Sequence, residues 1–230
     1  MTARPATPEP EIDWRAEDVP VSRCFDDPYF SPADGLAETT HVFLEGNDLP
    51  RRFAGAQGFR IGELGFGTGL NFAATLALWR RIAAPGAVLA YTAFEIAPMG
   101  AGQMARALRR WPEIAGEARE LLAAWPPDGT MELPGARLVL VAGDARTTLP
   151  RWSGTADAWF LDGFAPARNP EMWAPGLLAA AFARTVPGGT AATYSAAGAV
   201  RRALAEAGFE VRRTPGFSAK RHMTQAAKAF

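Results

Sequence analysis

Short apolar runs alternate with longer amphipathic segments from residue 59 to the end of the chain. Such runs predict buried strands, whereas apolar positions three to four residues apart predict helices. Strands are expected at 59–64, 88–94, 137–142, 156–161, 190–194, 210–213 and 223–226. Helices are expected at 70–82, 99–111, 112–125, 145–149, 175–184 and 197–207. Because this alternation is typical of right-handed βαβ units, it predicts an α/β fold with a mainly parallel seven-stranded sheet and a C-terminal antiparallel hairpin.

The N-terminal quarter of the chain lacks this alternation. Residues 1–20 contain few apolar side chains, so we expect a flexible N-terminal arm. Residues 21–58 mix aromatic and turn residues, which predicts an irregular extension with short strands or a hairpin rather than a long helix. The main domain is then expected at 59–230, with a helical insertion at about 99–125.

Composition excludes several classes of protein. The chain has 48% hydrophobic residues and no net charge, which argues against disorder throughout. Its single cysteine, Cys24, excludes an internal disulfide, and His41 and His222 are far apart, so no metal site is expected. No apolar run reaches the roughly 18–20 residues that span a bilayer, and the N-terminus shows no signal segment. We therefore expect a cytoplasmic protein without a membrane partner.

Charge is distributed unevenly along the chain. Residues 1–50 hold eleven acidic side chains and three arginines, whereas residues 198–230 hold seven Lys and Arg and two Glu. A basic C-terminal end can bind a polyanion such as a nucleic acid, although a solvated basic edge is the alternative. The candidates for such contacts are Lys220 and Arg221, with Arg201 and Arg202 as helpers.

A glycine-rich turn lies between the first expected strand and helix of the main domain. It has the form ExGxGxG, whereas a dinucleotide-binding turn, GxGxxG, needs a glycine where this chain has Leu70. Glycines allow a tight turn and close approach of a ligand to the backbone. A glutamate there repels a pyrophosphate but suits a cationic ligand such as S-adenosylmethionine. The turn thus resembles motif I of class I methyltransferases, while a plain helix N-terminus with small packing residues is the alternative.

Acidic residues also follow the next strands, at Glu95 and Asp144. Ligands of open α/β sheets bind beyond the carboxyl ends of the strands. A carboxylate at Glu95 can accept both ribose hydroxyls of the cofactor, and one at Asp144 can accept the adenine amine. Each could instead cap a helix. The candidate cofactor-binding residues are Glu63, Gly65, Phe66, Gly67, Gly69, Glu95, Asp144 and Ala145.

Asp162 lies in LDGFAP, at the end of the fourth expected strand. This place resembles that of the [ND]PP[YF] motif of methyltransferases that act on amino groups. A neutral amine must aim its lone pair, and an acceptor on its N–H groups both aims it and stabilises the cation that forms. Asp162 is therefore the predicted catalytic residue, and Phe164 the predicted aromatic wall for a flat substrate ring. Helix capping and core packing are the respective alternatives. Cys24 lies outside this region, which disfavours methylation of a pyrimidine ring carbon.

Longer sequence segments also resemble a known family, and the resemblance covers roughly residues 12–223. They are PVSRCFDDPYFSPADGLAETTHVFLEGNDLP (20–50), GELGFGTGLNF (62–72), DAWFLDGFAPARNPEMW (157–173), PGGT (187–190) and VRRALAEAGFEVRRTPGFSAKRHM (200–223). Together they resemble the MnmC family and its single-domain relative MnmD. The resemblance implies a class I, Rossmann-like methyltransferase fold. It also implies S-adenosylmethionine-dependent N-methylation of the 5-aminomethyl group of a wobble 2-thiouridine in tRNA.

The resemblance carries further expectations. Bifunctional MnmC adds a flavin-dependent oxidoreductase domain, but this chain has no second GxGxxG, so we expect no flavin here and a separate or lost oxidoreductase partner. Asp27, Tyr29 and Phe30 are expected to help cover the cofactor, with core packing as the alternative for the two aromatic residues. Ala142 stands where some relatives carry a bulky aromatic residue, so the sequence does not assign the side chain that packs against the adenine. The alternatives are an N-methyltransferase of a small-molecule or protein amine, and a non-catalytic binding module of the same fold.

Overall fold

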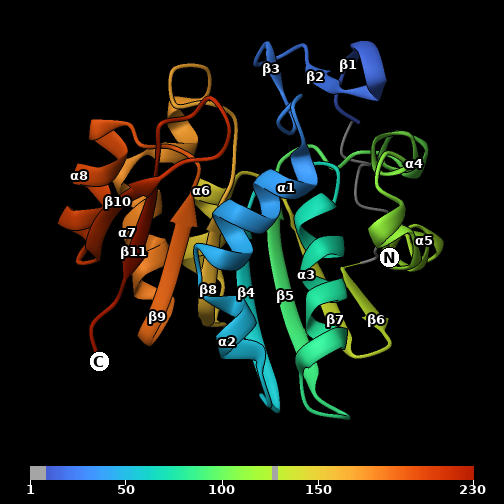
Figure 1. Ribbon diagram of the computed structural model, residues 1–230. Coiled ribbons are helices and arrows are strands. Elements are labelled where there is room, and N and C mark those ends of the chain that lie inside the picture. The colour runs from blue at the N-terminus through green and yellow to red at the C-terminus, as the bar shows by residue number, and fades with distance from the viewer. Residues whose placement is uncertain (1–8, 126–128) are drawn as a thin grey trace, which may run out of the picture.

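A computed structural model of the 230-residue chain describes residues 9–125 and 129–230. Its centre is an eight-stranded sheet with helices on both faces (Figure 1). Five neighbouring strands run parallel, in the order β7-β5-β4-β8-β9. They are β4 (Gly58–Leu64), β5 (Val88–Glu95), β7 (Ala136–Ala142), β8 (Ala156–Leu161) and β9 (Thr185–Thr193). The predicted α/β fold with a mainly parallel sheet is confirmed.

Antiparallel strands close both edges of the sheet. β11 (His222–Ala227) pairs with β9, and β10 (Glu210–Pro215) pairs with β11, which confirms the predicted C-terminal hairpin. On the other edge β6 (Thr130–Leu133) pairs with β7. This strand makes eight where the sequence predicted seven. Only Met131 of its four residues is buried, so no apolar run marks it in the sequence.

Two apolar cores cover the two faces of the sheet. Along β8, Trp159 packs on one face and Phe160 on the other, as the two-residue period of a strand requires. The helices of the first core are α2 (Leu49–Phe53), α3 (Leu70–Ile82), α4 (Ala101–Leu108) and α5 (Ala115–Ala123). Those of the second are α6 (Ala145–Thr148), α7 (Pro175–Ala183) and α8 (Gly198–Ala207). No helix among the described residues is long and apolar enough to cross a membrane.

The N-terminal segment forms a second, small sheet near the upper edge of the molecule in Figure 1. Its strands are β1 (Ile12–Trp14), β2 (Pro20–Ser22) and β3 (Asp27–Pro28), with a 3₁₀ turn η1 (Ala16–Asp18) between the first two. Residues 12–20 were expected in a flexible arm but are tied to α4. The Arg106 guanidinium lies 4.2 Å from the Trp14 ring centroid and bonds Asp18. The start of the predicted arm, residues 1–8, lies outside the described residues.

Helices follow this small sheet where the sequence suggested short strands. They are α1 (Gly35–Thr39), the π-helix η2 (Thr40–Glu45) and α2. Asp34 caps α1 by accepting a hydrogen bond from the Ala37 backbone N–H, and the helical turns bury Val42 and Phe43. Each of these helices has only five or six residues, too few to show a helical period in the sequence. The predicted helical insertion contains α4, the 3₁₀ turn η3 (Pro112–Ile114) and α5.

Candidate active site

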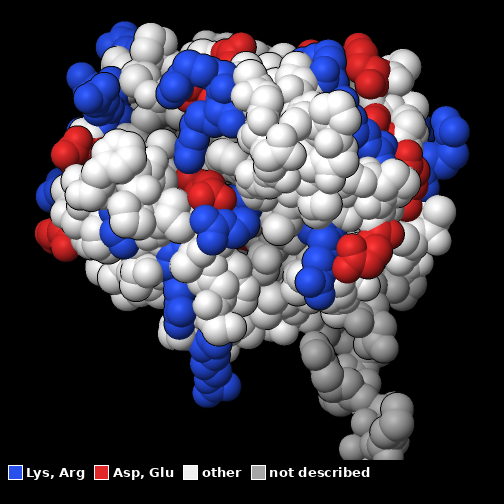
Figure 2. All heavy atoms as spheres, turned by 90° about the horizontal axis from the view of Figure 1, so that it is seen from below, with Lys and Arg blue, Asp and Glu red and all other residues white. Residues whose placement is uncertain are grey.

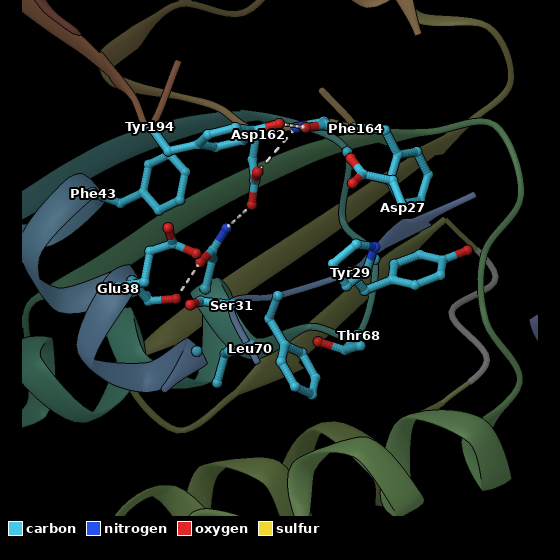
Figure 3. Close-up of a pocket in the computed structure, with 18 of the residues that line it drawn as sticks. Asp27, Tyr29, Ser31, Glu38, Phe43, Thr68, Leu70, Asp162, Phe164 and Tyr194 are labelled. Carbon is cyan, nitrogen blue, oxygen red and sulfur yellow. Dashed lines mark hydrogen bonds between the residues drawn. The ribbon is translucent and has the colours of Figure 1, made fainter. Parts of the chain in front are cut away.

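A cavity of about 260 Å³ lies at the carboxyl ends of the parallel strands, beneath β3 and the loop that follows it. Figure 3 shows its wall, to which the N-terminal segment, α1, the glycine turn and the ends of β5, β8 and β9 contribute. Of the predicted site residues, the cavity wall contains Gly65, Phe66, Gly67, Glu95, Asp162, Phe164 and Lys220. It does not contain Glu63, Gly69, Asp144, Ala145 or Arg221.

The glycine turn, residues 65–69, lies between β4 and α3. Gly65 has a φ of +84° and Gly67 a φ of +54°, the left-handed region that favours glycine. A Cβ on Gly65 would lie 2.8 Å from the Asp162 carbonyl oxygen, and a Cβ on Gly67 would lie 3.2 Å from Cδ1 of Tyr29. The turn therefore fits closely against β8 on one side and leaves a narrow gap to the N-terminal segment on the other.

Gly69 has a different use from the one predicted. Its φ is +78°, and a Cβ there would lie 2.8 Å from Cδ2 of Leu121 and 3.0 Å from Cε of Met104. Gly69 thus lets α3 begin close to α4 and α5, away from the cavity.

Glu95, at the end of β5, holds the glycine turn in place. Its Oε2 accepts hydrogen bonds from the backbone N–H groups of Phe66 (3.0 Å) and Gly67 (3.1 Å), and its Oε1 accepts one from Ala97 (2.9 Å). Burial raises the pKa of this carboxyl. A carboxylate has about four acceptor positions, so these three bonds leave capacity for a ligand hydroxyl.

Glu63 does not lie at the mouth of the turn, as the sequence suggested, but is fully buried beneath the cavity. Its Oε1 accepts a hydrogen bond from Asn71 Nδ2 (2.8 Å), and its Oε2 has no partner among the described residues. Burial raises the pKa of Glu63 well above its usual range. Because burial disfavours its charged form, Glu63 acts on the site through Asn71 rather than by attracting a cation directly.

Asp162 is held by two hydrogen bonds. Its Oδ2 accepts one from Asn71 Nδ2 (2.7 Å), and its Oδ1 accepts one from the Gly163 backbone N–H (2.9 Å). The Thr39 hydroxyl in turn donates to Oδ1 of Asn71 (2.7 Å) and fixes the amide. Burial raises the pKa of Asp162 to about 7, with the Glu38 carboxylate adding to the effect and the Asn71 hydrogen bond opposing it. The result is a fixed carboxyl group that titrates near neutral pH.

Lys220 lies in the cavity wall, next to Glu38. Its Nζ donates to Oε1 of Glu38 (2.7 Å) and lies 3.9 Å from the centroid of the Tyr194 ring. The Tyr194 hydroxyl donates to the Gly163 carbonyl oxygen (2.6 Å), which fixes the ring beside Asp162. The sequence assigned Lys220 to RNA phosphates, but the structure pairs it within the cavity.

An aromatic cluster forms the wall near the N-terminal segment. The Phe164 ring stacks on Phe25 at 4.7 Å between centroids and meets Tyr29 edge-on at 4.9 Å. Asp27 Oδ2 accepts a hydrogen bond from the Ala165 backbone N–H (2.7 Å), which ties β3 to the loop after β8. Asp27, Tyr29 and Phe30 all line the cavity, as expected of residues that cover a ligand.

Asp144 caps α6, one of the two uses considered for it. It accepts a hydrogen bond from the Arg146 backbone N–H (2.8 Å) and pairs with the Arg146 guanidinium (2.6 Å). These contacts lower the pKa of Asp144. Ala145 is buried behind it. Ile96, which follows Glu95 at the same edge of the sheet, is 55% exposed.

Arginines gather on the C-terminal hairpin and α8. Arg201, Arg213 and Arg221 approach His222, and together with desolvation they lower its pKa. Within residues 9–125 and 129–230, none of the three is within ion-pair distance of an acid. Figure 2 shows the face seen from below, away from the small N-terminal sheet, where basic and acidic groups lie side by side in several places.

Several polar residues of the cavity wall escaped prediction, and four of them lie around Asp162, namely Glu38, Thr39, Asn71 and Tyr194. Asn71 follows the glycine turn directly, so its place in the first turn of α3 was the available signal. The other three come from distant segments and no local pattern marks them. The described residues contain no group of three His, Cys, Asp or Glu side chains that could hold a metal ion.

Comparisons with known proteins agree with this geometry. A family model described as S-adenosyl-L-methionine-dependent methyltransferase matches residues 112–229. A solved structure of MnmC2 from Aquifex aeolicus superposes with a TM-score of 0.79 at 26% identity, covering 99% of this chain and 73% of that one. The chain thus has the fold and the family signature of an S-adenosyl-L-methionine-dependent methyltransferase.

Curated relatives narrow this class. The "tRNA 5-methylaminomethyl-2-thiouridine biosynthesis bifunctional protein MnmC" of Caulobacter vibrioides is 49% identical over 96% of this chain and 38% of its own length. Its counterpart in Stutzerimonas stutzeri is 45% identical over 96% of this chain and 35% of its own length. The chain belongs to the MnmC methyltransferase family, which confirms the resemblance found in the sequence. It spans little more than a third of the length of these relatives.

Proposed function

We propose that this chain transfers a methyl group from S-adenosylmethionine to the 5-aminomethyl group of a wobble (2-thio)uridine in tRNA, giving 5-methylaminomethyl-2-thiouridine. The observation that carries the proposal is the fixed carboxyl group of Asp162, which faces a cavity beside the glycine turn. Such a group can hold an amine through its N–H groups. The 45–50% identity to MnmC proteins supports tRNA as the source of that amine.

The cavity suits a ligand with positive charge. Four acids line it, with Lys220 as the one described cation in its wall; the acids are Asp27, Glu38, Glu95 and Asp162. S-adenosylmethionine supplies, when bound, a methyl group on a positively charged sulfur. We assign the backbone of Gly65 to Gly67 and the carboxylate of Glu95 to holding it. Asp144, Ala145 and the exposed Ile96 would lie along its adenine, at the ends of the neighbouring strands.

Asp162 orients the amine and manages its proton. Its carboxylate oxygens accept N–H bonds from the substrate nitrogen and direct the nitrogen lone pair into the cavity. The nitrogen must lose one proton overall when it gains the methyl group, and Asp162 Oδ2 can hold that proton. A pKa of about 7 is well matched to this task at neutral pH. Asn71 and Thr39 keep the carboxylate in place.

The rest of the substrate would meet an aromatic wall and a basic surface. Phe164, supported by Phe25, offers a flat face to the uracil ring. Arg201, Arg213 and Arg221 gather around His222 and can meet phosphates of the anticodon arm. Arg202 is a further candidate. A cytoplasmic location, where tRNA is modified, fits this proposal.

The decisive experiment is nucleoside analysis of tRNA after incubation with the protein and methyl-labelled S-adenosylmethionine. Label in 5-methylaminomethyl-2-thiouridine from aminomethyl-bearing tRNA, and none from tRNA without that group, is the expected result. Cofactor binding without label in any nucleoside would overturn the tRNA assignment. Labelling of free amines or proteins instead would favour a different amine substrate.

A further inference from the structure

The loop between β10 and β11 carries two neighbouring basic residues, of which only one belongs to the cavity wall. Lys220 and Arg221 are both exposed, but Lys220 also lines the cavity and bonds Glu38. Nothing in the proposed function so far uses Lys220, and its ammonium occupies space next to the catalytic carboxyl group. The groups around this ammonium therefore show what that end of the cavity is built to bind.

The Lys220 ammonium sits in a site made for a primary ammonium. The Glu38 carboxylate, whose side chain is only 11% exposed, accepts its hydrogen bond at 2.7 Å. The face of the Tyr194 ring lies 3.9 Å away, at cation–π distance. Figure 3 shows Glu38, Asp162 and Tyr194 grouped at this end of the cavity. A carboxylate and an aromatic face together recognise an alkylammonium, which is the form of an aminomethyl group in water at neutral pH.

We propose that Glu38 and the Tyr194 ring form the subsite that first receives the primary ammonium of the substrate, and that Lys220 fills this subsite in the free protein and leaves it when the substrate enters. The inference rests on the proposed function, because it takes an aminomethyl group as the substrate. From this subsite the amine lies beside Asp162, which then takes its proton.

Charge explains why Lys220 must leave. A bound sulfonium, a substrate ammonium and the Lys220 ammonium would place three cations within one small cavity, against its carboxyl groups. These are Asp27, which already accepts a hydrogen bond from the Ala165 backbone N–H, and Glu38, Glu95 and Asp162. Two of these carboxyl groups have pKa values raised by burial, so the negative charge available near neutral pH is smaller than their number suggests. The Lys220 side chain is 44% exposed, so its ammonium can return to water while a substrate ammonium takes its place on the mostly buried Glu38 carboxylate.

Nuclear magnetic resonance of the lysine side chains tests the displacement directly. The chain has only two lysines, Lys220 and Lys228, so a protein labelled with ¹⁵N at lysine Nζ gives two signals. Lys228 also lies over an aromatic ring, 4.3 Å from the Phe182 centroid, but outside the cavity, which makes it a matched control. With S-adenosylhomocysteine bound, an anticodon stem-loop bearing 5-aminomethyluridine should shift the Lys220 signal and leave that of Lys228 unchanged. The same stem-loop with plain uridine should shift neither. A Lys220 signal that stays in place with the aminomethyl ligand bound overturns the proposal.

Binding measurements with variants test the subsite itself. The quantity measured is the ratio of affinities for the aminomethyl and plain stem-loops. Lys220→Met removes the ammonium that competes with the substrate for Glu38 and Tyr194. It should raise this ratio by about tenfold, which corresponds to the free energy of a weak ion pair plus a cation–π contact. Glu38→Gln should lower it at least about tenfold, and Lys228→Met should leave it unchanged. A ratio in Lys220→Met equal to or below that of the unaltered protein contradicts the inference.

Failure of this inference can be told from failure of the proposed function. The unaltered protein is assayed alongside for label transfer to aminomethyl-bearing tRNA. If transfer occurs but Lys220 does not move, only the subsite assignment is wrong. If no transfer occurs, the proposed function itself fails. Binding of S-adenosylhomocysteine and the melting temperature of each variant show that it is folded.

Discussion

The two ends of the cavity are built in different ways. At the end proposed for the cofactor (the cofactor end), the backbone of the glycine turn is held by Glu95, whose carboxylate accepts three main-chain N–H bonds. At the end proposed for the amine (the amine end), side chains take part as well: Asp162 accepts one bond from Asn71 and one from the Gly163 backbone, and Glu38 accepts one from Lys220. Main-chain bonds fix a shape, whereas side-chain partners can exchange and titrate. The first end is therefore suited to hold a ligand still, and the second to accept an amine and release its proton.

The largest expected effect comes from removing the carboxyl group at the amine end. Asp162→Ala should slow methylation of aminomethyl-tRNA by at least about a hundredfold, the usual scale for losing a positioned polar group. Asp162→Asn keeps an acceptor oxygen, so it should retain more activity if orientation dominates. It should be as slow as Asp162→Ala if stabilising the developing cation dominates. Single-turnover rates at saturating cofactor measure both.

Glu95→Gln is the counterpart of Asp162→Asn at the cofactor end. An amide nitrogen there would face backbone N–H groups, so binding of S-adenosylhomocysteine should weaken, while Asp162→Asn should leave that binding nearly unchanged. If both changes affect cofactor affinity alike, the two ends are not separate. An Asp162→Ala protein with a near-normal rate would remove Asp162 from the mechanism.

The second expected effect tests the shape of the glycine turn. Gly67→Val places a Cβ about where the turn faces the Tyr29 ring, 3.2 Å away, and should narrow the gap in which the cofactor is proposed to lie. S-adenosylhomocysteine affinity should fall by at least about tenfold, as titration calorimetry would show. Gly86→Val is the matched control. Its φ of +80° gives a similar backbone cost, but no described atom lies within 4 Å of a Cβ there. Equal S-adenosylhomocysteine affinities in Gly67→Val and Gly86→Val would show that the glycine turn does not bind the cofactor.

The same contrast explains how much the sequence could predict. At the cofactor end, the glycine turn and the start of α3 at Leu70 form one contiguous motif, and Glu95 ends the next strand, so local pattern was enough to single them out. Their roles toward the cofactor stay predictions. The main sheet was predicted for the same reason, except for the short edge strand β6. Strands place apolar side chains every two residues and helices every three to four, and both periods can be seen directly in a sequence.

The amine end could be predicted only in part. Asp162 was found because it ends a strand, but Glu38, Asn71 and Tyr194 reach it from segments that are far apart in the chain. Glu38 lies on helix α1, which has only five residues and so shows no helical period in the sequence. Glu63 was misplaced because a sequence shows that an acid precedes the turn but not that its side chain points beneath the cavity. Lys220 was misplaced because charge counting does not show which way a loop residue points.

A third, smaller effect separates Arg221 from Lys220 in RNA binding. With tRNA that lacks the aminomethyl group, Arg221→Ala should weaken binding a fewfold and reduce the salt slope by about one, the value for one phosphate contact. Lys220→Ala should leave the slope unchanged, because Lys220 is engaged with Glu38 in the cavity. Affinity measured at several salt concentrations gives both slopes. If the salt slope falls equally in both variants, both residues contact phosphates. If the slope is unchanged in Arg221→Ala, Arg221 does not contact a phosphate and this surface does not bind RNA.

The smallest expected effect is on stability, and it tests whether the amine end titrates. The pKa of Asp162 is raised by burial from 3.8 to about 7, so the folded protein keeps a proton that the unfolded chain loses near pH 4. Folding then binds a proton between these values, and stability conferred by Asp162 falls as pH rises through this window.

Asparagine cannot ionise, so Asp162→Asn lacks this pH dependence. The melting temperature of Asp162→Asn minus that of the unaltered protein should therefore increase from pH 5 to pH 8. A pKa raised from 3.8 to about 7 is worth about 2–3 kcal/mol between these two pH values. The gain should therefore be about 5–10 °C, since 1 kcal/mol shifts the melting temperature of a protein this size by about 2–4 °C. Calorimetry at both pH values measures it, and because all other groups titrate in both proteins, their contributions largely cancel in the difference. A difference that stays constant with pH would mean that Asp162 is already charged in the folded protein, and that the amine end is as fixed as the cofactor end.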